Sequence, residues 1–423
     1  MSVKTDWYSR HPIIHITHHP SPIVGMGAKA LTPPSGAVFF GHHQLHATVV
    51  GRSVSSPPSS EGGLLFDWGS TCVTFTTIGS SYVLLEMNSG KAKVTCEIKR
   101  SDRGSTSETI VLDKKARRCY LSKDLPVDVE VTFTLQRRNE PVAGGLRPTE
   151  LLGIHLEATG TIVAPSAPSA PPRRHHIEFV GDSDTAGYGN IGKTTSLYNI
   201  FSGYPSDQDT NQAWPAVVAR TFDADHTNIS YSGIGAVFNA PIPGFTNDTM
   251  FDLYPRLICM DASTDTSSSS SCAMLPPTDC VVVYLGGNDY WTFASKKEKE
   301  VLFVEGFVRF LLRVRELRGE DVPIVVLLCD ERSGSCLGTA ADQQKYSETM
   351  ERTLRNAVDG AGGGIHVKCV DCSKDPIVLG AKGAWGSNAH WSAASHVLWS
   401  KGVAVVLAEV MGWAAGGEVK CNL

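Results

Sequence analysis

Two kinds of hydrophobic pattern divide this chain. Between residues 36 and 163, apolar and polar residues alternate, or β-branched and aromatic residues cluster, in short runs separated by turn-forming residues, as at 72–76, 81–85, 92–98 and 127–135. No helical period of useful length occurs there. Short strands at this spacing are typical of an antiparallel sandwich. We therefore predict an all-β sandwich, with a jelly roll as its form.

The pattern changes after residue 175. Apolar strands such as 324–328 alternate with segments of helical period, of which 298–318 and 340–358 are the longest. This alternation predicts an α/β domain in which a parallel sheet lies between helices, as in flavodoxin-like folds.

A stretch rich in Pro, Ala and Ser at 164–174 separates the two patterns, and such a composition predicts an extended, semi-rigid linker. The 423-residue chain, 42% hydrophobic, is long enough for two or three domains. We expect a lead-in segment at 1–35, the sandwich at 36–163, the linker, and the α/β domain at 175–415.

The most informative motif lies where the first strand of the α/β domain ends. Residues 176–190 run from an apolar strand into Gly181-Asp182-Ser183 and then a turn of small residues. Open α/β sheets place their functional sites at the carboxyl ends of strands. The motif is not the Gly-x-Ser-x-Gly elbow of α/β-hydrolases, because Thr185 stands where that motif needs glycine.

Three further short motifs follow in order along the chain. They lie at 229–235 with Gly233, at 281–289 with Asn288 and Asp289, and at 388–391 with Asn388, His390 and Trp391. Each is a common turn or cap when taken alone. Because all of them occur in order at strand ends or helix starts, they predict one catalytic site.

The residue types indicate the chemistry of an ester hydrolase. Ser183 is the candidate nucleophile and His390 the general base that takes its proton. The backbone N–H groups of Ser183 and Gly233, with the Asn288 side chain, are the candidate oxyanion hole. This chemistry requires no metal ion or organic cofactor.

The third member of a catalytic triad is missing from the expected positions. Neither Ser387 nor Asn388, which precede the histidine, is a carboxylate, so a backbone carbonyl near Asn388, or its amide oxygen, is expected to orient His390. Asp371 and Asp375, upstream in the same region, remain alternatives. Asp182 and Asp289 are expected to fix the turns through bonds to backbone N–H groups. Asp184 beside the nucleophile is expected to face solvent or cap the next helix.

These four motifs resemble those of the SGNH (GDSL) hydrolases, and the preceding sandwich resembles that of carbohydrate esterase family 2. The resemblance covers about residues 41–413 and includes 51–52, 66–69, 177–190, 211–215 and 286–291. SGNH hydrolases commonly have an aspartate three residues before the histidine, whereas some members of this esterase family use a Ser–His dyad oriented by a backbone carbonyl. The resemblance therefore implies hydrolysis of O-acetyl esters on xylan, glucomannan or related glycans.

Aromatic side chains beside the motifs are candidates for substrate binding, because sugars stack their C–H faces on aromatic rings. We expect Tyr290 and Trp291 to form such a platform. For Trp391, a sugar platform and a place in the core are equally good interpretations.

Charge and cysteine content exclude several other functions. The net charge of −5 comes from 38 basic and 43 acidic residues without strong clustering, which argues against a nucleic-acid partner. Eleven cysteines leave at least one without an intrachain partner. The Cys369–Cys372 spacing lacks the second pair that a zinc site needs, and the histidines near the start lack matching ligands. We expect no metal site.

The beginning of the chain has no apolar segment typical of a signal peptide, and no apolar run approaches 18 residues. We therefore expect no membrane partner, and the localisation stays open between the cytoplasm and export by another route. Separately, we expect a monomer. Its partner would be an acetylated oligo- or polysaccharide.

Two other functions remain open from sequence. One is a glycan-binding protein whose esterase domain has lost activity, which the missing acid and Asp184 favour. The other is an SGNH enzyme that acts on lipid or aryl esters, which would need an apolar cleft.

Overall fold

The computed structural model describes the larger part of the chain, beginning at Leu31. The described residues are 31–56, 62–104, 106–112, 115–141, 146–164, 175–192, 205–242, 246–267, 274–294, 296–329, 340–370, 384–387 and 390–414. The expected linker therefore lies outside the described residues apart from Ala164, and so does all but the end of the lead-in segment.

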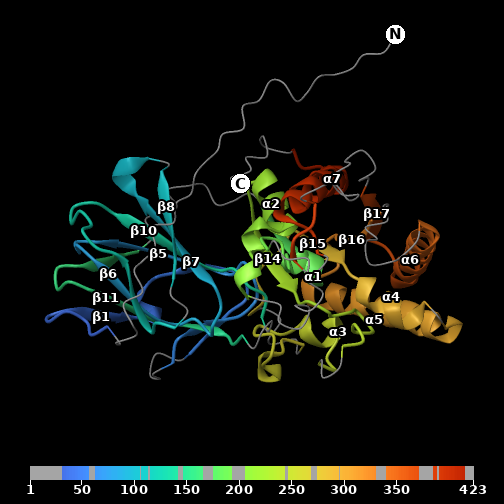
Figure 1. Ribbon diagram of the computed structural model, residues 1–423, viewed down its shortest axis with the longest axis horizontal. Coiled ribbons are helices and arrows are strands. Elements are labelled where there is room, and N and C mark those ends of the chain that lie inside the picture. The colour runs from blue at the N-terminus through green and yellow to red at the C-terminus, as the bar shows by residue number, and fades with distance from the viewer. Residues whose placement is uncertain are drawn as a thin grey trace, which may run out of the picture.

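The first half of the chain folds into two six-stranded antiparallel sheets (Figure 1). One sheet has the order β3-β4-β11-β6-β9 with β1 beside β11, and the other has the order β12-β5-β10-β7-β8 with β2 beside β5. The strands of the first are β1 (Val38–Gly41), β3 (Val54–Ser55), β4 (Leu64–Phe66), β6 (Val83–Asn88), β9 (Arg118–Ser122) and β11 (Thr149–Leu156). Those of the second are β2 (Thr48–Val50), β5 (Cys72–Ile78), β7 (Val94–Arg100), β8 (Ser107–Val111), β10 (Val131–Arg137) and β12 (Thr161–Val163).

Alternation along β10 shows why these strands form a sandwich. Val131, Phe133 and Leu135 are buried in the core shared by the two sheets, and the Phe133 ring stacks on Phe75 of β5 with centroids 5.4 Å apart. The threonines between them point away and pair with threonines of β5, as in the 3.1 Å bond between Thr74 and Thr134. The strand begins at Val131, later than the expected 127, because 127–130 form a turn in which Val127 is exposed.

The second half contains a five-stranded parallel sheet with the order β14-β13-β15-β16-β17. Its strands are β13 (His175–Gly181), β14 (Ala224–Ser230), β15 (Cys280–Tyr284), β16 (Ile324–Cys329) and β17 (Ile365–Val370). Counted along the chain, this order is 2-1-3-4-5, that of flavodoxin-like folds. The strand order reverses between β13 and β15, so a ligand site is expected at the carboxyl ends of these two strands.

Helices cover both faces of this sheet. They are α1 (Ser183–Ala186), α2 (Trp214–Thr221), α3 (Met250–Leu253), α4 (Gly287–Phe293), α5 (Lys297–Arg318), α6 (Ala340–Ala361) and α7 (Ala393–Met411). α2 and α7 share one core with Phe179 and Val282, while α5 and α6 share the other with Val281 and Val283. Strands buried on both faces explain the continuous apolar runs seen in the sequence.

The last helix, α7, is apolar enough in length and composition to cross a membrane, and it is the one helix of which this holds in the part of the chain that the structure describes. The helix is not an uninterrupted apolar run, because His396, Lys401 and Glu409 lie within it. Trp399, Val403 and Leu407 of α7 are buried against the sheet, so core packing accounts for its composition.

The sandwich and the α/β domain meet through buried polar contacts as well as apolar ones. Trp68, which follows β4, lies in the α/β core and donates its indole N–H to the Arg256 carbonyl at 3.3 Å. Arg52 of the sandwich pairs with Glu178 of β13 at 3.0 Å, and both side chains are fully buried. The domain junction thus includes ionised groups that water does not reach.

Candidate active site

The turn after β13 holds Ser183 at the carboxyl edge of the sheet. A side chain on Gly181 would come within 2.0 Å of the Thr185 hydroxyl oxygen, so only glycine allows the strand to turn into α1 here. The Asp182 carboxylate accepts the backbone N–H of Asp184 at 3.2 Å and caps α1. Ser183, the first residue of that helix, is half-buried.

The turn after β14 lies directly beside this one. Gly181 and Ser230 are partners in the sheet, and the Tyr231 N–H donates to the Gly181 carbonyl at 3.3 Å. Gly233 has a φ of +82°, a conformation that favours glycine. The turn that carries the candidate oxyanion donor is therefore anchored to the strand that carries the nucleophile.

Asn288 connects the two turns. Its side-chain amide donates to the Asp182 carboxylate at 3.2 Å and to the Ile234 carbonyl at 2.8 Å. Both amide N–H groups therefore have acceptors, and an oxyanion would compete with the Asp182 carboxylate for one of them.

Asp289 anchors the loop that follows Gly233. It is fully buried and accepts the backbone N–H groups of Ala236, Val237 and Phe238 at 3.0, 2.8 and 2.7 Å. Burial raises the pKa of this carboxyl to about 6, while the three backbone donors oppose that rise.

The loop that carries His390 packs against the turn that follows Ser183. The Ser387 N–H donates to the Gly189 carbonyl at 2.8 Å, and the His390 N–H donates to the Ser387 carbonyl at 3.2 Å. The His390 ring meets the edge of Tyr188, with centroids 4.7 Å apart, and the Tyr188 N–H donates to the Ser183 carbonyl at 2.9 Å. The structure thus brings His390 to the edge of the sheet that carries Ser183.

Carboxylates and histidines interact across this site. Burial raises the pKa of Asp184, and the charge of His390 lowers it, so Asp184 lies close enough to His390 for their charges to interact. Burial, and then the Asp184 charge, raise the pKa of Asp182 well above its usual range. Burial and His390 lower the pKa of His396 to about 3, and His396 accepts the Trp214 N–H at 3.3 Å. His396 is therefore neutral.

The residue expected to orient His390 lies outside the described residues, since the structure does not describe Asn388. Asp184 is half-buried, contrary to the expectation that it faces solvent, and its interaction with His390 was not foreseen. Tyr188 was also missed. An aromatic ring five residues after the nucleophile has no motif of its own, and only the fold brings it to His390.

The three candidate platform aromatics have very different exposures. Trp291 is 50% exposed, whereas Tyr290 is 8% and Trp391 4% exposed. Residues 287–293 form helix α4 rather than a plain turn, so Tyr290 points into the core against Phe293 while Trp291 stands one turn after Asn288. Trp391 packs on Trp399 with centroids 5.2 Å apart. Of the three rings, Trp291 is therefore the exposed one, whereas Tyr290 and Trp391 are buried.

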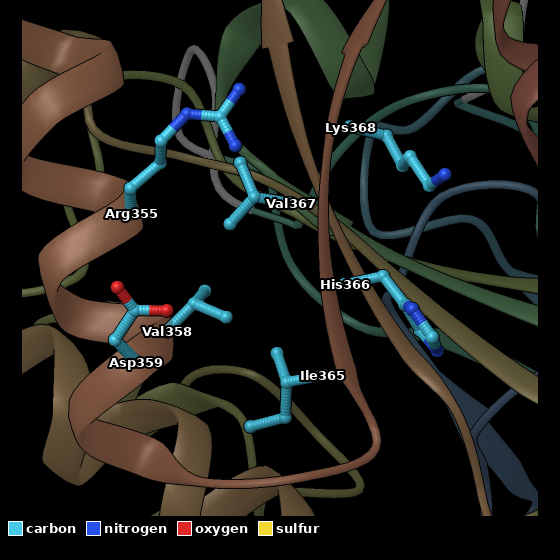
Figure 2. A pocket seen from close by; sticks show the side chains of 7 residues that line it. All are labelled: Arg355, Val358, Asp359, Ile365, His366, Val367 and Lys368. Atoms are coloured by element: carbon cyan, nitrogen blue, oxygen red, sulfur yellow. The ribbon is translucent and has the colours of Figure 1, made fainter.

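A separate surface hollow of about 330 Å³ lies between α6 and β17, the outer strand of the sheet. Figure 2 shows Arg355, Val358 and Asp359 of α6 facing Ile365 and Val367, with His366 and Lys368 on the other side of the strand. The residues that line the hollow include none of the candidate site residues. Within the described residues no group of three His, Cys, Asp or Glu is placed to hold a metal ion.

Solved structures of carbohydrate esterases share this fold over most of both chains. A carbohydrate esterase family 2 enzyme with a carbohydrate-binding domain from Corynascus thermopiles (Myceliophthora fergusii) superposes with a TM-score of 0.64 at 22% identity, covering 87% of this chain and 100% of that one. A family two carbohydrate esterase from Cellvibrio japonicus gives 0.65 at 16% identity, covering 89% and 98%. The resemblance to this esterase family is thereby confirmed at the level of the fold.

Two curated relatives match shorter stretches. The acetylxylan esterase / glucomannan deacetylase of Cellvibrio japonicus is 24% identical over 229 residues, which are 52% of this chain and 55% of that protein. The cellulase/esterase CelE of Acetivibrio thermocellus is 29% identical over 183 residues, 43% of this chain and 20% of that protein. The chain thus spans about half the length of the first and a fifth of the second. The family model described as GDSL-like lipase/acylhydrolase matches residues 177–401, more than half of the chain, and the chain therefore belongs to that family.

Proposed function

We propose that this protein is a serine esterase that removes O-acetyl groups from carbohydrate. The observation that carries the proposal is the meeting of three segments at the point where the sheet order reverses. These are the Ser183 turn, the Gly233 turn and the His390 loop. Family membership adds the expectation of ester chemistry, and the names of the relatives add acetylated glycans as substrates.

In the proposed reaction, the Ser183 hydroxyl attacks the acetyl carbonyl while His390 takes its proton. A new C–O bond forms, and the carbonyl oxygen becomes an oxyanion held by the N–H groups of Ser183 and Gly233 and by Asn288. His390 then donates the proton to the departing sugar hydroxyl, and an acetyl-enzyme remains. Water repeats the sequence and releases acetate. Each such donor contributes about 3–4 kcal/mol to the transition state.

His390 becomes positively charged in this reaction, and Asp184 is a described carboxylate that interacts with that charge. We propose that Asp184 stabilises the imidazolium, while a backbone carbonyl or the Asn388 amide keeps the ring oriented. The two roles are separable, because a charge acts over several ångströms whereas ring orientation needs a direct hydrogen bond.

We propose that the glycan lies across the exposed face of Trp291. The acetylated sugar would then sit between this ring and Ser183. The jelly-roll connectivity of the sandwich, the four segment boundaries expected from the sequence, and a monomeric state remain parts of the proposal.

The test compares wild type with Ser183→Ala on 4-nitrophenyl acetate and on acetylated xylo-oligosaccharide. Wild type is expected to hydrolyse both, and Ser183→Ala to lose about 10⁴-fold or more in kcat. Equal rates for the two proteins would contradict the esterase function. Hydrolysis of long-chain 4-nitrophenyl esters in preference to acetate would favour a lipase.

A further inference from the structure

A loop of the sandwich enters the candidate active site. The segment after β10 leads to Glu140, which is fully buried although it lies in the first half of the chain. Its carboxylate accepts the Ser232 backbone N–H at 2.6 Å and the Ser232 hydroxyl at 2.8 Å. Ser232 directly precedes Gly233, so Glu140 holds the residue next to the candidate oxyanion donor.

The same loop also contacts the helix that carries the nucleophile. The Glu140 backbone N–H donates to the side-chain oxygen of Gln208 at 3.2 Å, and the Gln208 amide donates to the Ala186 carbonyl at 3.1 Å. Ala186 is the last residue of α1, which begins at Ser183. Glu140 is therefore linked to both halves of the site, to one by its side chain and to the other by its backbone.

The pairing at Ser232 is strongest with a carboxylate anion, whose two oxygens accept both donors of Ser232. A protonated carboxyl accepts the backbone N–H but donates its own O–H to the Ser232 hydroxyl oxygen, so both bonds become neutral and weaker. Burial raises the pKa of Glu140 to about 7, against the two Ser232 bonds and the charge of Arg137. Tyr231 and Cys259 also face it, and its charge adds to the effect of burial in raising their pKa values.

We propose that Glu140 is a positioning residue of the esterase, which fixes the Gly233 turn against the nucleophile and thereby makes the sandwich a working part of the active site. This inference rests on the proposed function. It assigns the sandwich a role in the chemical step that is separate from any binding of glycan.

The test is Glu140→Gln, whose side chain has nearly the same size. Its amide oxygen accepts the Ser232 N–H and its NH₂ group donates to the Ser232 hydroxyl oxygen, so two charge-assisted bonds become weaker neutral ones and the turn is held less firmly. We expect kcat on 4-nitrophenyl acetate to fall about 10- to 100-fold, below the effect of deleting an oxyanion donor outright, and KM to change less than about twofold. Ser232→Ala, which keeps the backbone bond, should lose less.

A matched control is Asp67→Asn. Asp67 is also a buried carboxylate of the sandwich, and it accepts a backbone N–H of the α/β domain, that of Cys259, at 3.1 Å. Its hydrogen bond goes to Cys259 and not to Ser232, so the kcat of Asp67→Asn should stay within about twofold of wild type. The ratio of wild-type to Glu140→Gln kcat should shrink as the pH falls from 8 to 5.5, because Glu140 becomes protonated in wild type. A residue that served only to hold the fold would not give this pH-dependent ratio.

A second measurement does not depend on activity. Hydrogen–deuterium exchange of a peptide covering 229–236 should rise in Glu140→Gln and not in Asp67→Asn. If wild type has no more activity than Ser183→Ala, the proposed function fails, and this exchange still decides whether Glu140 fixes the turn. The proposal is overturned if exchange in Glu140→Gln rises no more than in the control. For an active wild type, it is equally overturned by a kcat within twofold of wild type.

Discussion

Two glutamates bridge the same pair of domains, and their surroundings differ in one respect. Glu178 and Glu140 are both fully buried. Glu178 accepts from Arg52 at 3.0 Å, from the Tyr254 hydroxyl at 2.6 Å and from the Arg318 Nε at 3.0 Å. The hydrogen bonds to the Glu140 carboxylate come from Ser232, which is neutral.

The difference appears in the two pKa values. Two arginines overcome the effect of burial and lower the pKa of Glu178 to about 2, whereas burial prevails at Glu140 and raises its pKa to about 7. A carboxylate with cationic partners stabilises the junction. Glu140, whose carboxylate hydrogen bonds in the described structure come from a neutral residue, costs stability when ionised, and it lies beside the Gly233 turn, where we propose it has a function.

The largest effect is expected from removing the charge that balances the arginines. Glu178→Gln leaves Arg52 and Arg318 buried without their anion, and breaking such a cluster costs about 3–5 kcal/mol. The urea midpoint should fall accordingly. The wild-type contribution is present above pH 4.5, the usual pKa of Glu, and is lost as the pH falls towards 2. As a control, Glu300→Gln breaks a partly exposed pair with Arg352 and should cost about 1 kcal/mol or less. Equal urea midpoints for Glu178→Gln and Glu300→Gln would contradict the expectation that the buried cluster stabilises the protein more than the partly exposed pair.

The contribution of Glu140 to stability should depend on pH in the opposite direction to that of Glu178. The pKa of Glu140 is higher in the folded chain than in the unfolded one, so its contribution to stability is full below about pH 4.5 and is lost as the pH rises through about 7. At pH 8 the free energy of unfolding of Glu140→Gln should therefore exceed that of wild type by up to about 3 kcal/mol, and its melting temperature should be higher, with no such gain at pH 5. A variant that is both slower and less stable at pH 8 would show that Ser232 satisfies the carboxylate better than its pKa indicates.

A smaller effect is expected from the carboxylate beside the nucleophile. Asp184→Asn removes an anion that interacts with His390, and a half-buried charge pair contributes about 1 kcal/mol, which is about fivefold in kcat/KM. Hydrolysis of 4-nitrophenyl acetate at pH 8 measures it. The control is Asp223→Asn, an exposed carboxylate after α2, which should have no effect. If Asp184→Asn has the kcat/KM of wild type, Asp184 does not assist His390, and only the groups that orient the His390 ring would then support it.

The smallest effect is expected from a site residue that is neither buried nor charged. Trp291→Ala should raise KM for acetylated xylo-oligosaccharide about three- to tenfold through lost stacking, and leave kcat for 4-nitrophenyl acetate within twofold. Leu312→Ala, an exposed apolar change on α5, serves as its control. A loss of kcat on both substrates would mean that Trp291 supports the site from within and does not bind the sugar.

Local hydrophobic patterns were enough to predict the sheet type of each of the two domains. Alternation in residues such as Val131, Phe133 and Leu135 predicted the antiparallel sheets, and the runs at 281–284 and 324–328 predicted the parallel one. The four motifs indicated the family because each lies at a strand end or helix start and their order along the chain is preserved.

Contacts between distant residues could not be predicted in this way. Glu140 and Ser232 are 92 positions apart and belong to different domains, so no spacing connects them. Tyr290 and Trp291 are adjacent aromatic residues, and the sequence alone does not indicate which of them is buried. A helix of seven residues turns one inward and the other outward, and such a short helix leaves too weak a period to detect. The exposure of each of these two rings could therefore be determined only from the structure.

The bond between Glu140 and Ser232 also concerns the order in which the protein is made. A chain leaves the ribosome from its amino end, and domains fold as units as they emerge. The strands from β1 to β12 all precede Ser183 in the chain, so a sandwich that folds first would present Glu140 to the Gly233 turn as that turn forms. The sandwich then acts as an internal assembly template. A gene fragment that begins after the sandwich would encode a parallel sheet whose Gly233 turn lacks Glu140, so under our proposal moving the α/β domain between proteins would require the sandwich to move with it.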